Sequence, residues 1–161
     1  MLLMDSLRDT FRDSHEAADQ LAQSLREHVD ESAQVVPIGA GSRALAAAVS
    51  DRLEGCSMGD GLGSRAPRTV VLVAERIRRI GPVDELMAAL LEAGAERVVI
   101  ATPLATSKAA YAVDDRADAF VCLRRTPKLG TIGGWYERWT FASVRPLAPV
   151  VHLRSRRAVA V

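Results

Sequence analysis

Four short, mainly apolar runs, separated by segments with helical patterns, constrain the fold of this chain more than any other feature. The runs cover residues 34–38, 69–73, 97–101 and 119–123, and their apolar residues are consecutive rather than alternating with polar ones. Strands that are apolar on both faces are typical of a parallel sheet covered by helices on both sides. The sequence therefore predicts a doubly wound α/β domain in which these four strands are parallel in one sheet.

Four segments before and between these runs show helical patterns, at residues 14–29, 43–53, 83–93 and 106–112. Asp13 followed by Glu16 is typical of a helix N-cap with its return partner, and this pair marks the start of the first helix. Pro82 and Gly94 mark the start and the end of the third helix. Strands and helices therefore alternate along the chain, as an α/β domain requires.

The remaining segments predict loops and a tail. Residues 54–68 contain four glycines and predict a glycine-rich loop. The tail, residues 145–161, has a mixed composition, and Val150, Val151 and Leu153 are a candidate edge strand within it. With 161 residues and no internal repeat, we expect a single domain over residues 1–161.

Composition excludes several classes of function. With 21 basic and 20 acidic residues the net charge is +1, so no overall field attracts nucleic acid or anionic lipid. Two cysteines, Cys56 and Cys122, and three scattered histidines predict neither a disulfide framework nor a metal site. Charges in the first twelve positions argue against a signal peptide, and the apolar runs are too short to span a membrane. We therefore expect a cytoplasmic protein with no nucleic-acid partner and no membrane partner.

Ligands of open α/β sheets bind at the carboxyl ends of the strands. In this chain that rule selects the loops at residues 39–43, 74–82, 102–107 and 124–134. We expect any functional site to be built from these four segments.

A pattern of small, apolar and aromatic residues in the second half of the chain resembles that of the bacterial phosphoribosyltransferases of the type I fold. The residues that carry the similarity are Ala93-Gly94-Ala95, Val98-Val99, Ala101, Pro103, Ala117-Asp118, Val121-Cys122-Leu123, Pro127, Gly134 and Trp135-Tyr136. Phe11-Arg12-Asp13 with Glu16-Ala17 resembles the opening of the family's first helix. The similarity covers roughly residues 11–141, with residues 54–68 unmatched. It implies a phosphoribosyltransferase-like sheet flanked by helices.

The resemblance also implies a chemistry. Members of the family transfer ribose-5-phosphate from phosphoribosyl pyrophosphate to an acceptor, usually with Mg²⁺. Two acids after the signature strand contact the ribose hydroxyls, and a loop rich in glycine and threonine holds the 5′-phosphate. The matching acid positions here are Ala74 and Glu75, so Glu75 is the candidate catalytic residue.

The phosphate loop departs from the family pattern. Arginines replace its small residues, Gly81 lies one place late, and Pro82 removes a backbone N–H donor. The family's flexible hood, an insert with basic residues before the signature strand, has no counterpart in residues 55–68. Several groups lost together from a preorganised site make ordinary catalysis unfavourable.

Anion binding is still expected at two of the strand ends. The turn after residues 34–38 is glycine-bearing and opens a helix, so its backbone can face a phosphate. The candidate phosphate-binding residues are Gly39, Ala40, Gly41, Ser42 and Arg43 on this turn and Arg76, Arg78, Arg79 and Gly81 on the next. Trp135 and Tyr136 follow the last strand and are candidates for contact with a base. Each set can also be explained without a ligand: the glycine residues as a tight turn, the arginines as a solvated run of charges, and the aromatic residues as part of a core.

Two functional hypotheses follow. In the first, the chain is a phosphoribosyltransferase-like module without catalysis that binds phosphate, a nucleotide or a protein, as a homodimer or beside an active relative. In the second, it is an active phosphoribosyltransferase with an unknown acceptor, and Mg²⁺ is then its cofactor. A third reading, a decaying remnant that still folds, stays open. The segment 74–82 discriminates between these hypotheses. If it forms a phosphate cradle with Glu75 facing the cleft, ligand binding is retained, and if its arginines fill the cleft, ligand binding is lost.

Overall fold

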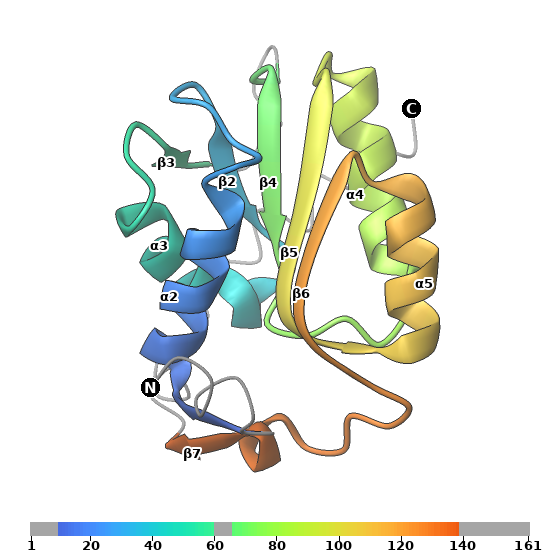
Figure 1. The fold of residues 1–161 in the computed structure, drawn as a ribbon. Helices are drawn as coiled ribbons and strands as arrows, with labels where there is room; N and C mark the ends of the chain where they lie inside the picture. Colours follow the sequence, from blue (N-terminus) through green and yellow to red (C-terminus); the bar gives the residue numbers. More distant parts are fainter. Residues whose placement is uncertain (1–9, 60–65, 139–161) are drawn as a thin grey trace.

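The computed structural model describes residues 10–59 and 66–138, and five parallel strands form its central sheet. The strands, in spatial order, are β3 (Ser57–Met58), β2 (Gln34–Pro37), β4 (Thr69–Val73), β5 (Arg97–Thr106) and β6 (Ala119–Thr126). Every neighbouring pair is parallel. The prediction of four parallel strands is confirmed, and β3 is a short edge strand in a segment for which we expect only a loop (Figure 1). The candidate edge strand in the tail lies outside the described residues.

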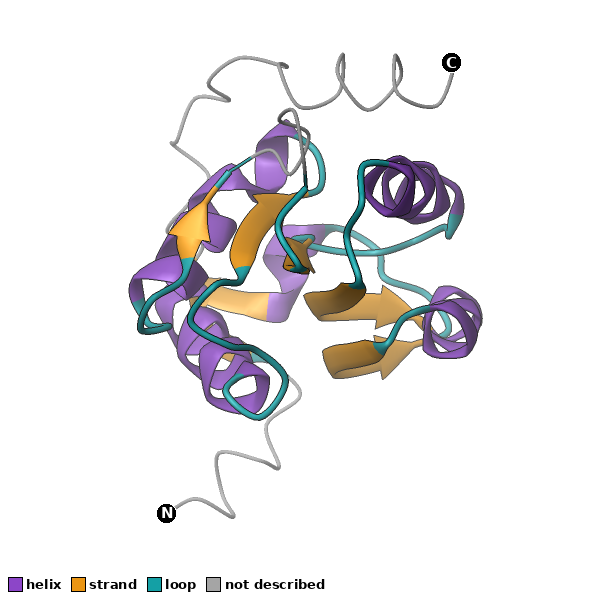
Figure 2. Cartoon of the chain, turned by 90° about the horizontal axis from the view of Figure 1, so that it is seen from above, coloured by secondary structure: helices purple, strands orange, loops and turns teal. Residues whose placement is uncertain are grey.

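Two layers of helices enclose this sheet (Figure 2). The helices α2 (Ser14–Leu25) and α3 (Arg43–Asp51) pack on one face. The helices α4 (Gly81–Glu92) and α5 (Ser107–Arg116) pack on the other. The domain is therefore doubly wound, as the alternation of apolar runs and helical patterns predicts.

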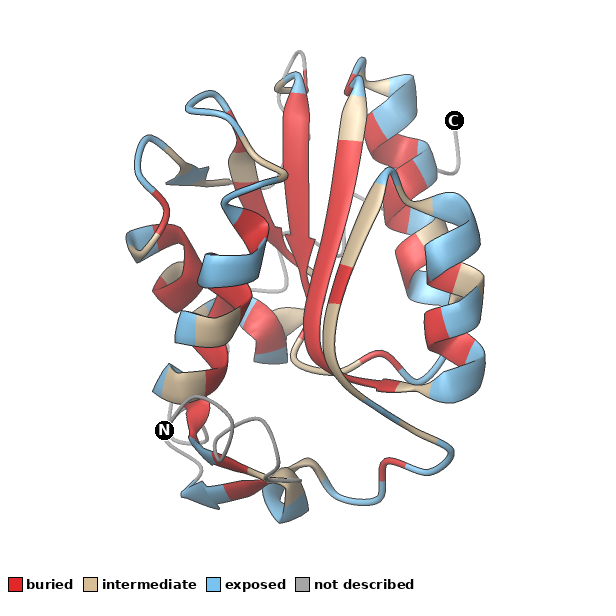
Figure 3. Ribbon diagram, viewed as in Figure 1, coloured by how far each residue is buried: buried red, intermediate tan, exposed pale blue. Residues whose placement is uncertain are grey.

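The two faces of β4 explain why its sequence does not alternate. Val71 and Val73 pack against the layer of α2 and α3, whereas Val70 and Leu72 pack against α4 and α5. All four side chains are fully buried, and Figure 3 shows the central strands buried along most of their length. Burial of apolar surface on both faces is the main stabilising contribution of such a strand.

The helix ends follow local sequence signals. The Asp13 side chain accepts a hydrogen bond from the N–H of Glu16 at 2.9 Å, and the Glu16 carboxylate accepts one from the N–H of Arg12 at 2.5 Å. The first bond satisfies an N–H group that the first turn of the helix leaves free, and the second holds the Glu16 side chain against Arg12, the residue before the N-cap. Gly94 follows α4 with a φ of 103°, a conformation that favours glycine. The first helix ends at Leu25 rather than residue 29, because a tighter turn with the N–H of His28 on the carbonyl of Leu25 replaces its last turn.

A second, two-stranded sheet lies beyond the carboxyl ends of β5 and β6 (Figure 1). Its strands, β1 (Phe11–Asp13) and β7 (Tyr136–Arg138), are parallel and pair Phe11 with Tyr136. The two rings lie 5.3 Å apart between centroids, and the Arg124 guanidinium stands 4.8 Å above the ring of Phe11. Leu104 and Leu129 complete this small apolar cluster. The sequence patterns do not predict this sheet, which joins the beginning and the end of the described chain.

Candidate functional site

Two turns meet at the carboxyl ends of the neighbouring strands β2 and β4. The first turn runs from Gly39 through the short 3₁₀ helix η1 (Ala40–Ser42) into α3, and the second runs from Ala74 to Ile80 before α4. The N–H of Glu75 donates a hydrogen bond to Oγ of Ser42 at 2.9 Å. Ser42 is buried, so its hydroxyl joins the two turns rather than facing solvent.

The carboxyl group of Glu75 lies against the first turn. A Cβ placed on Gly41 would be 2.9 Å from Oε1 of Glu75, so glycine permits this close approach. The Arg76 guanidinium lies 3.4 Å from the same oxygen, and the Glu75 side chain is only 20% exposed. Burial raises the pKa of Glu75 above its ordinary value, and the charge of Arg76 acts in the opposite direction. The predicted cradle for a phosphate, Gly39–Arg43, is therefore next to an acid in this structure.

An arginine-lined cavity of about 200 Å³ opens beside these turns. Its lining residues are Arg76, Arg78 and Arg79 together with Ile38, Ala74, Ile77, Pro82 and Val83. Arg78 also donates to the carbonyl oxygen of Gly130 at 2.7 Å, which ties it to the loop after β6. The three arginines selected from the sequence thus line one cavity. Ile38, which lies between β2 and the first turn, also lines it.

Backbone hydrogen bonds hold the second turn against β5. The N–H of Ile77 donates to the carbonyl of Leu104 at 2.9 Å, and the N–H of Thr106 donates to the carbonyl of Ile77 at 3.0 Å. Residues 102–106, for which we expect a loop, are therefore strand: Ala105 bridges to Ile77 on one side, and Thr102 and residues 104–106 pair with β6 on the other. The N–H groups of Glu75 and Ile77 are therefore engaged within the protein, and the side chains of Arg76, Arg78 and Arg79 supply hydrogen-bond donors to this cavity.

The other predicted site residues lie as follows. Gly81 is the first residue of α4, and a Cβ placed on it would meet no atom within 4 Å. Tyr136 is 6% exposed and packs with Phe11, and burial raises the pKa of its hydroxyl, with a smaller contribution from Glu75. Trp135 is half-buried and donates from Nε1 to the carbonyl of Leu129 at 2.6 Å. Both aromatic side chains thus have partners within the protein. The negative charge of Glu75 interacts electrostatically with the Tyr136 hydroxyl.

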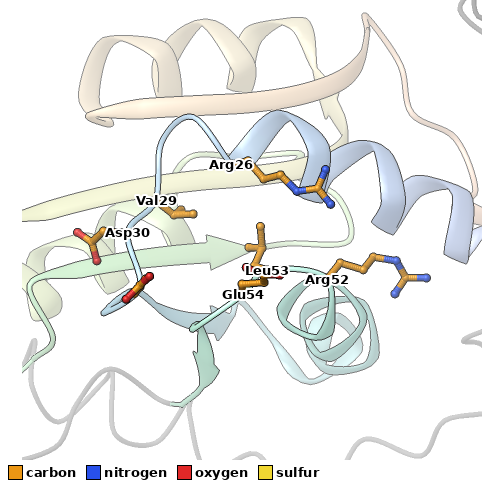
Figure 4. Close-up of a pocket in the computed structure, with 7 residues that line it drawn as sticks. Arg26, Val29, Asp30, Arg52, Leu53 and Glu54 are labelled. Carbon is orange, nitrogen blue, oxygen red and sulfur yellow. The ribbon is translucent and has the colours of Figure 1, made fainter.

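A larger cavity, of about 500 Å³, lies near the amino end of β2, at the other end of the sheet from the arginine-lined cavity (Figure 4). It is formed where α2 and α3 end, and its lining residues are Arg26, Val29, Asp30, Glu31, Arg52, Leu53 and Glu54. Several of these charges already have partners: Arg52 pairs with Asp19, and Asp30 accepts from Ser32 and Thr69. Sequence reasoning missed this cavity, because no motif or spacing marks the two helix ends as neighbours.

The residues at the arginine-lined cavity do not fit a divalent cation. Mg²⁺ prefers carboxylate oxygens, and the carboxylate next to the cavity, that of Glu75, is paired with Arg76. Across residues 10–59 and 66–138, no three His, Cys, Asp or Glu side chains are grouped as metal ligands. None of the helices in these ranges is long and apolar enough to cross a membrane.

Solved structures match this fold, whereas no protein-family model matches the chain and no curated protein matches its sequence. TT1426 from Thermus thermophilus matches with a TM-score of 0.67 at 17% identity, over 94% of this chain and 98% of that one. A purine phosphoribosyltransferase from Pyrococcus horikoshii matches with a TM-score of 0.58 at 16% identity, over 88% and 98%. A hypothetical protein from Neisseria gonorrhoeae with bound ppGpp has the same TM-score and identity, over 94% of both chains.

Proposed function

We propose that this chain, which has the fold of the phosphoribosyltransferases, binds the phosphate group of a nucleotide-like ligand without catalysing transfer. The observation that carries the proposal is the meeting of Arg76, Arg78 and Arg79 at one cavity. This cavity lies at the carboxyl edge of a parallel sheet, where α/β proteins bind ligands. Arginine is well suited to the task, because its planar guanidinium can donate two parallel hydrogen bonds to a phosphate.

The size and lining of the cavity support a phosphate group as the part that enters it. A volume of about 200 Å³ corresponds to several water molecules at about 30 Å³ each. The rest of a nucleotide would extend outside, along the loops that follow the strands. The ppGpp bound by the similar protein from Neisseria gonorrhoeae supports a phosphorylated nucleotide as the ligand class.

Isothermal titration calorimetry at low ionic strength tests this function. The ligands are inorganic phosphate, AMP, GMP, ppGpp and phosphoribosyl pyrophosphate, each with and without Mg²⁺. We expect weak binding that falls as salt is added, because exposed charges are screened and the arginines lose freedom on binding. Mg²⁺ should not be needed for inorganic phosphate to bind.

A pair of triple variants with equal charge controls for non-specific attraction. Replacing Arg76, Arg78 and Arg79 by alanine should remove binding. The control replaces Arg68, Arg116 and Arg125, which form ion pairs elsewhere on the surface, and it should keep binding within about twofold of the parent. Equal losses in both variants, or no heat from any ligand at low salt, would overturn the proposal.

An active transferase is the second candidate, and Glu75 favours it. Its carboxyl group lies at the carboxyl end of β4 next to the glycine turn, at the position that the family resemblance assigns to a ribose contact. Ala74 in place of a second acid and Pro82 at the start of α4 weigh against turnover. Association with a second copy or with an active relative remains a prediction, which analytical ultracentrifugation can check.

A further inference from the structure

We propose that Glu75 competes with the bound phosphate for Arg76, so that binding is coupled to uptake of a proton by the Glu75 carboxyl group. This inference rests on the proposed phosphate binding and adds its regulation by pH. Its structural basis is a shared cation: Arg76 lines the cavity and also pairs with Oε1 of Glu75 at 3.4 Å. A phosphate in the cavity and a charged Glu75 therefore draw on the same guanidinium.

The Glu75 carboxyl group is closely packed on the side of the first turn. A Cβ on Gly41 would lie 2.9 Å from its Oε1, and the backbone of Glu75 is held to this turn by the hydrogen bond from its N–H to the hydroxyl of Ser42. Its side chain is only 20% exposed, so water stabilises the charge poorly. A carboxylate held in this position next to a phosphate would experience repulsion at short range.

The charged and titratable groups that face Glu75 come from two elements. Arg76, from the same turn, stabilises the carboxylate, and Tyr136 of β7 contributes a hydroxyl whose own pKa is raised by burial. The third element packed against it, the turn at Gly41 and Ser42, offers backbone and a hydroxyl. Tyr136 stays neutral at ordinary pH, so the charge of Arg76 is what opposes the effect of burial on Glu75.

The sign of the coupling follows from these neighbours. When a phosphate engages Arg76, Glu75 loses part of its stabilising cation and gains a negative charge nearby, and both changes raise its pKa further. A group whose pKa rises on binding takes up protons between its free and bound values. By reciprocity, the phosphate should bind more tightly as the pH falls through that window.

Calorimetry with inorganic phosphate in buffers of different ionisation enthalpy measures the number of protons taken up. We would run it between pH 5 and pH 7.5 on the parent protein, on Glu75→Gln and on the control Glu85→Gln, an exposed acid on α4. Phosphate also titrates in this range, and its bound pKa depends on the charge of residue 75, so the carboxyl shift described below assigns the proton to Glu75. The parent and the control should take up a fraction of a proton, at most one, more than Glu75→Gln does.

Affinity gives a second readout. As the pH rises, the dissociation constant of the parent for phosphate should increase more steeply than that of Glu75→Gln, by a further factor of up to ten for each pH unit. At pH 7, Glu75→Gln should bind phosphate more tightly than the parent. A third readout does not depend on any variant: the ¹³C chemical shift of the Glu75 carboxyl should move toward the protonated value when phosphate is added to the parent protein.

The outcomes separate the two proposals. If neither phosphate nor any of the nucleotide ligands binds to the parent, the proposed function is overturned. If phosphate binds with the same proton uptake in the parent and in Glu75→Gln, or with no change in the Glu75 carboxyl shift, the proton coupling is overturned and the binding function stands. If Glu75→Gln does not fold, the carboxyl shift of the parent alone decides.

Discussion

Glu75 lies where its charged form is disfavoured, because burial raises its pKa more than Arg76 lowers it. The contribution of Glu75 to the free energy of folding must therefore change with pH. A raised pKa means that the folded state holds a proton that the unfolded state releases, once the pH exceeds the ordinary value of 4.5. The contribution of Glu75 to stability is thus fully present below that value and is lost as the pH rises through the folded pKa.

The variant Glu75→Gln should therefore be more stable than the parent at pH 7, because the amide keeps the volume of the side chain and avoids the buried charge. The difference should shrink as the pH falls and vanish below about 4.5, where the parent carboxyl is protonated in both states. Urea unfolding between pH 4 and pH 8 measures it, with Glu85→Gln as the control. A Glu75→Gln protein less stable than the parent at pH 7 would mean that the pair with Arg76 outweighs the cost of burial.

At the scale of single elements, the start of α2 depends on Asp13. Its side chain caps the helix through the N–H of Glu16, and this hydrogen bond is the main cause of its lowered pKa. A depressed pKa contributes stability above the ordinary value of 3.8, and that stability is lost as the pH falls through the folded value. The same carboxylate lies 3.7 Å from Arg138 of β7, its partner across the second sheet, so Asp13 contributes both to the start of α2 and to the pairing of β1 with β7.

Replacing Asp13 by alanine should reduce the free energy of unfolding by about 0.5–2 kcal/mol, the usual cost of losing an N-cap. Asparagine keeps the capping oxygen and loses the attraction to the arginines, so Asp13→Asn should lie between the alanine variant and the parent at pH 7. As the pH falls through the folded pKa of Asp13, the parent should approach Asp13→Asn, because a protonated carboxyl keeps a capping oxygen but loses its charge, and Asp13→Ala should stay the least stable. Urea unfolding of the three proteins checks the order, and an alanine variant as stable as the parent would show that the cap contributes nothing.

Elements with strong local signals were predictable from the sequence. The bounds of β4 agree with the prediction, because a run of buried branched residues between the charged residues Arg68 and Glu75 has few alternatives. The extension of β5 to Thr106 was not predictable, since Pro103 lacks an N–H and normally argues against a central strand. β1 and β7 have three residues each and pair over a long sequence distance, so no local pattern marks them.

The candidate site was predictable only in part. The rule that ligands bind at strand ends selects Arg76, Arg78 and Arg79, which line one cavity, whereas the other candidate phosphate-binding residues, Gly39–Arg43 and Gly81, are not among its lining residues. The contact of Glu75 with Gly41 is a tertiary contact between two turns, and spacing along the chain holds no information about it.

For the whole molecule, the lost groups of the phosphate loop predict the absence of transferase turnover. We expect no product from phosphoribosyl pyrophosphate with adenine, guanine, hypoxanthine, xanthine, uracil or orotate, with or without Mg²⁺. Chromatographic detection of the nucleoside monophosphate measures it. Product that disappears in Glu75→Ala and persists in Glu85→Ala would establish the active-transferase hypothesis instead.

The small apolar cluster between β1 and β7 stabilises the molecule as a whole, and Phe11 is its centre. Phe11 is 1% exposed and contacts both Tyr136 and Arg124. Replacing it by alanine should cost about 3–5 kcal/mol, measured by urea unfolding, and should weaken the near-ultraviolet circular dichroism of Tyr136. The control Phe120→Ala, at a half-buried ring on β6, should cost less. Equal losses would show that the cluster around Phe11 contributes no more than the packing of one half-buried ring against the main core.

The pairing of β1 with β7 also has a consequence for how the chain is made. Phe11 and its partner Tyr136 are 125 residues apart, and a ribosome that adds ~5–20 residues per second needs roughly 6–25 s to synthesise that interval. During this time Phe11 has no strand to pair with and its ring is available to other apolar surfaces, including chaperones. The surroundings of Glu75 that include Tyr136 are therefore completed only after nearly all of the described chain has been translated.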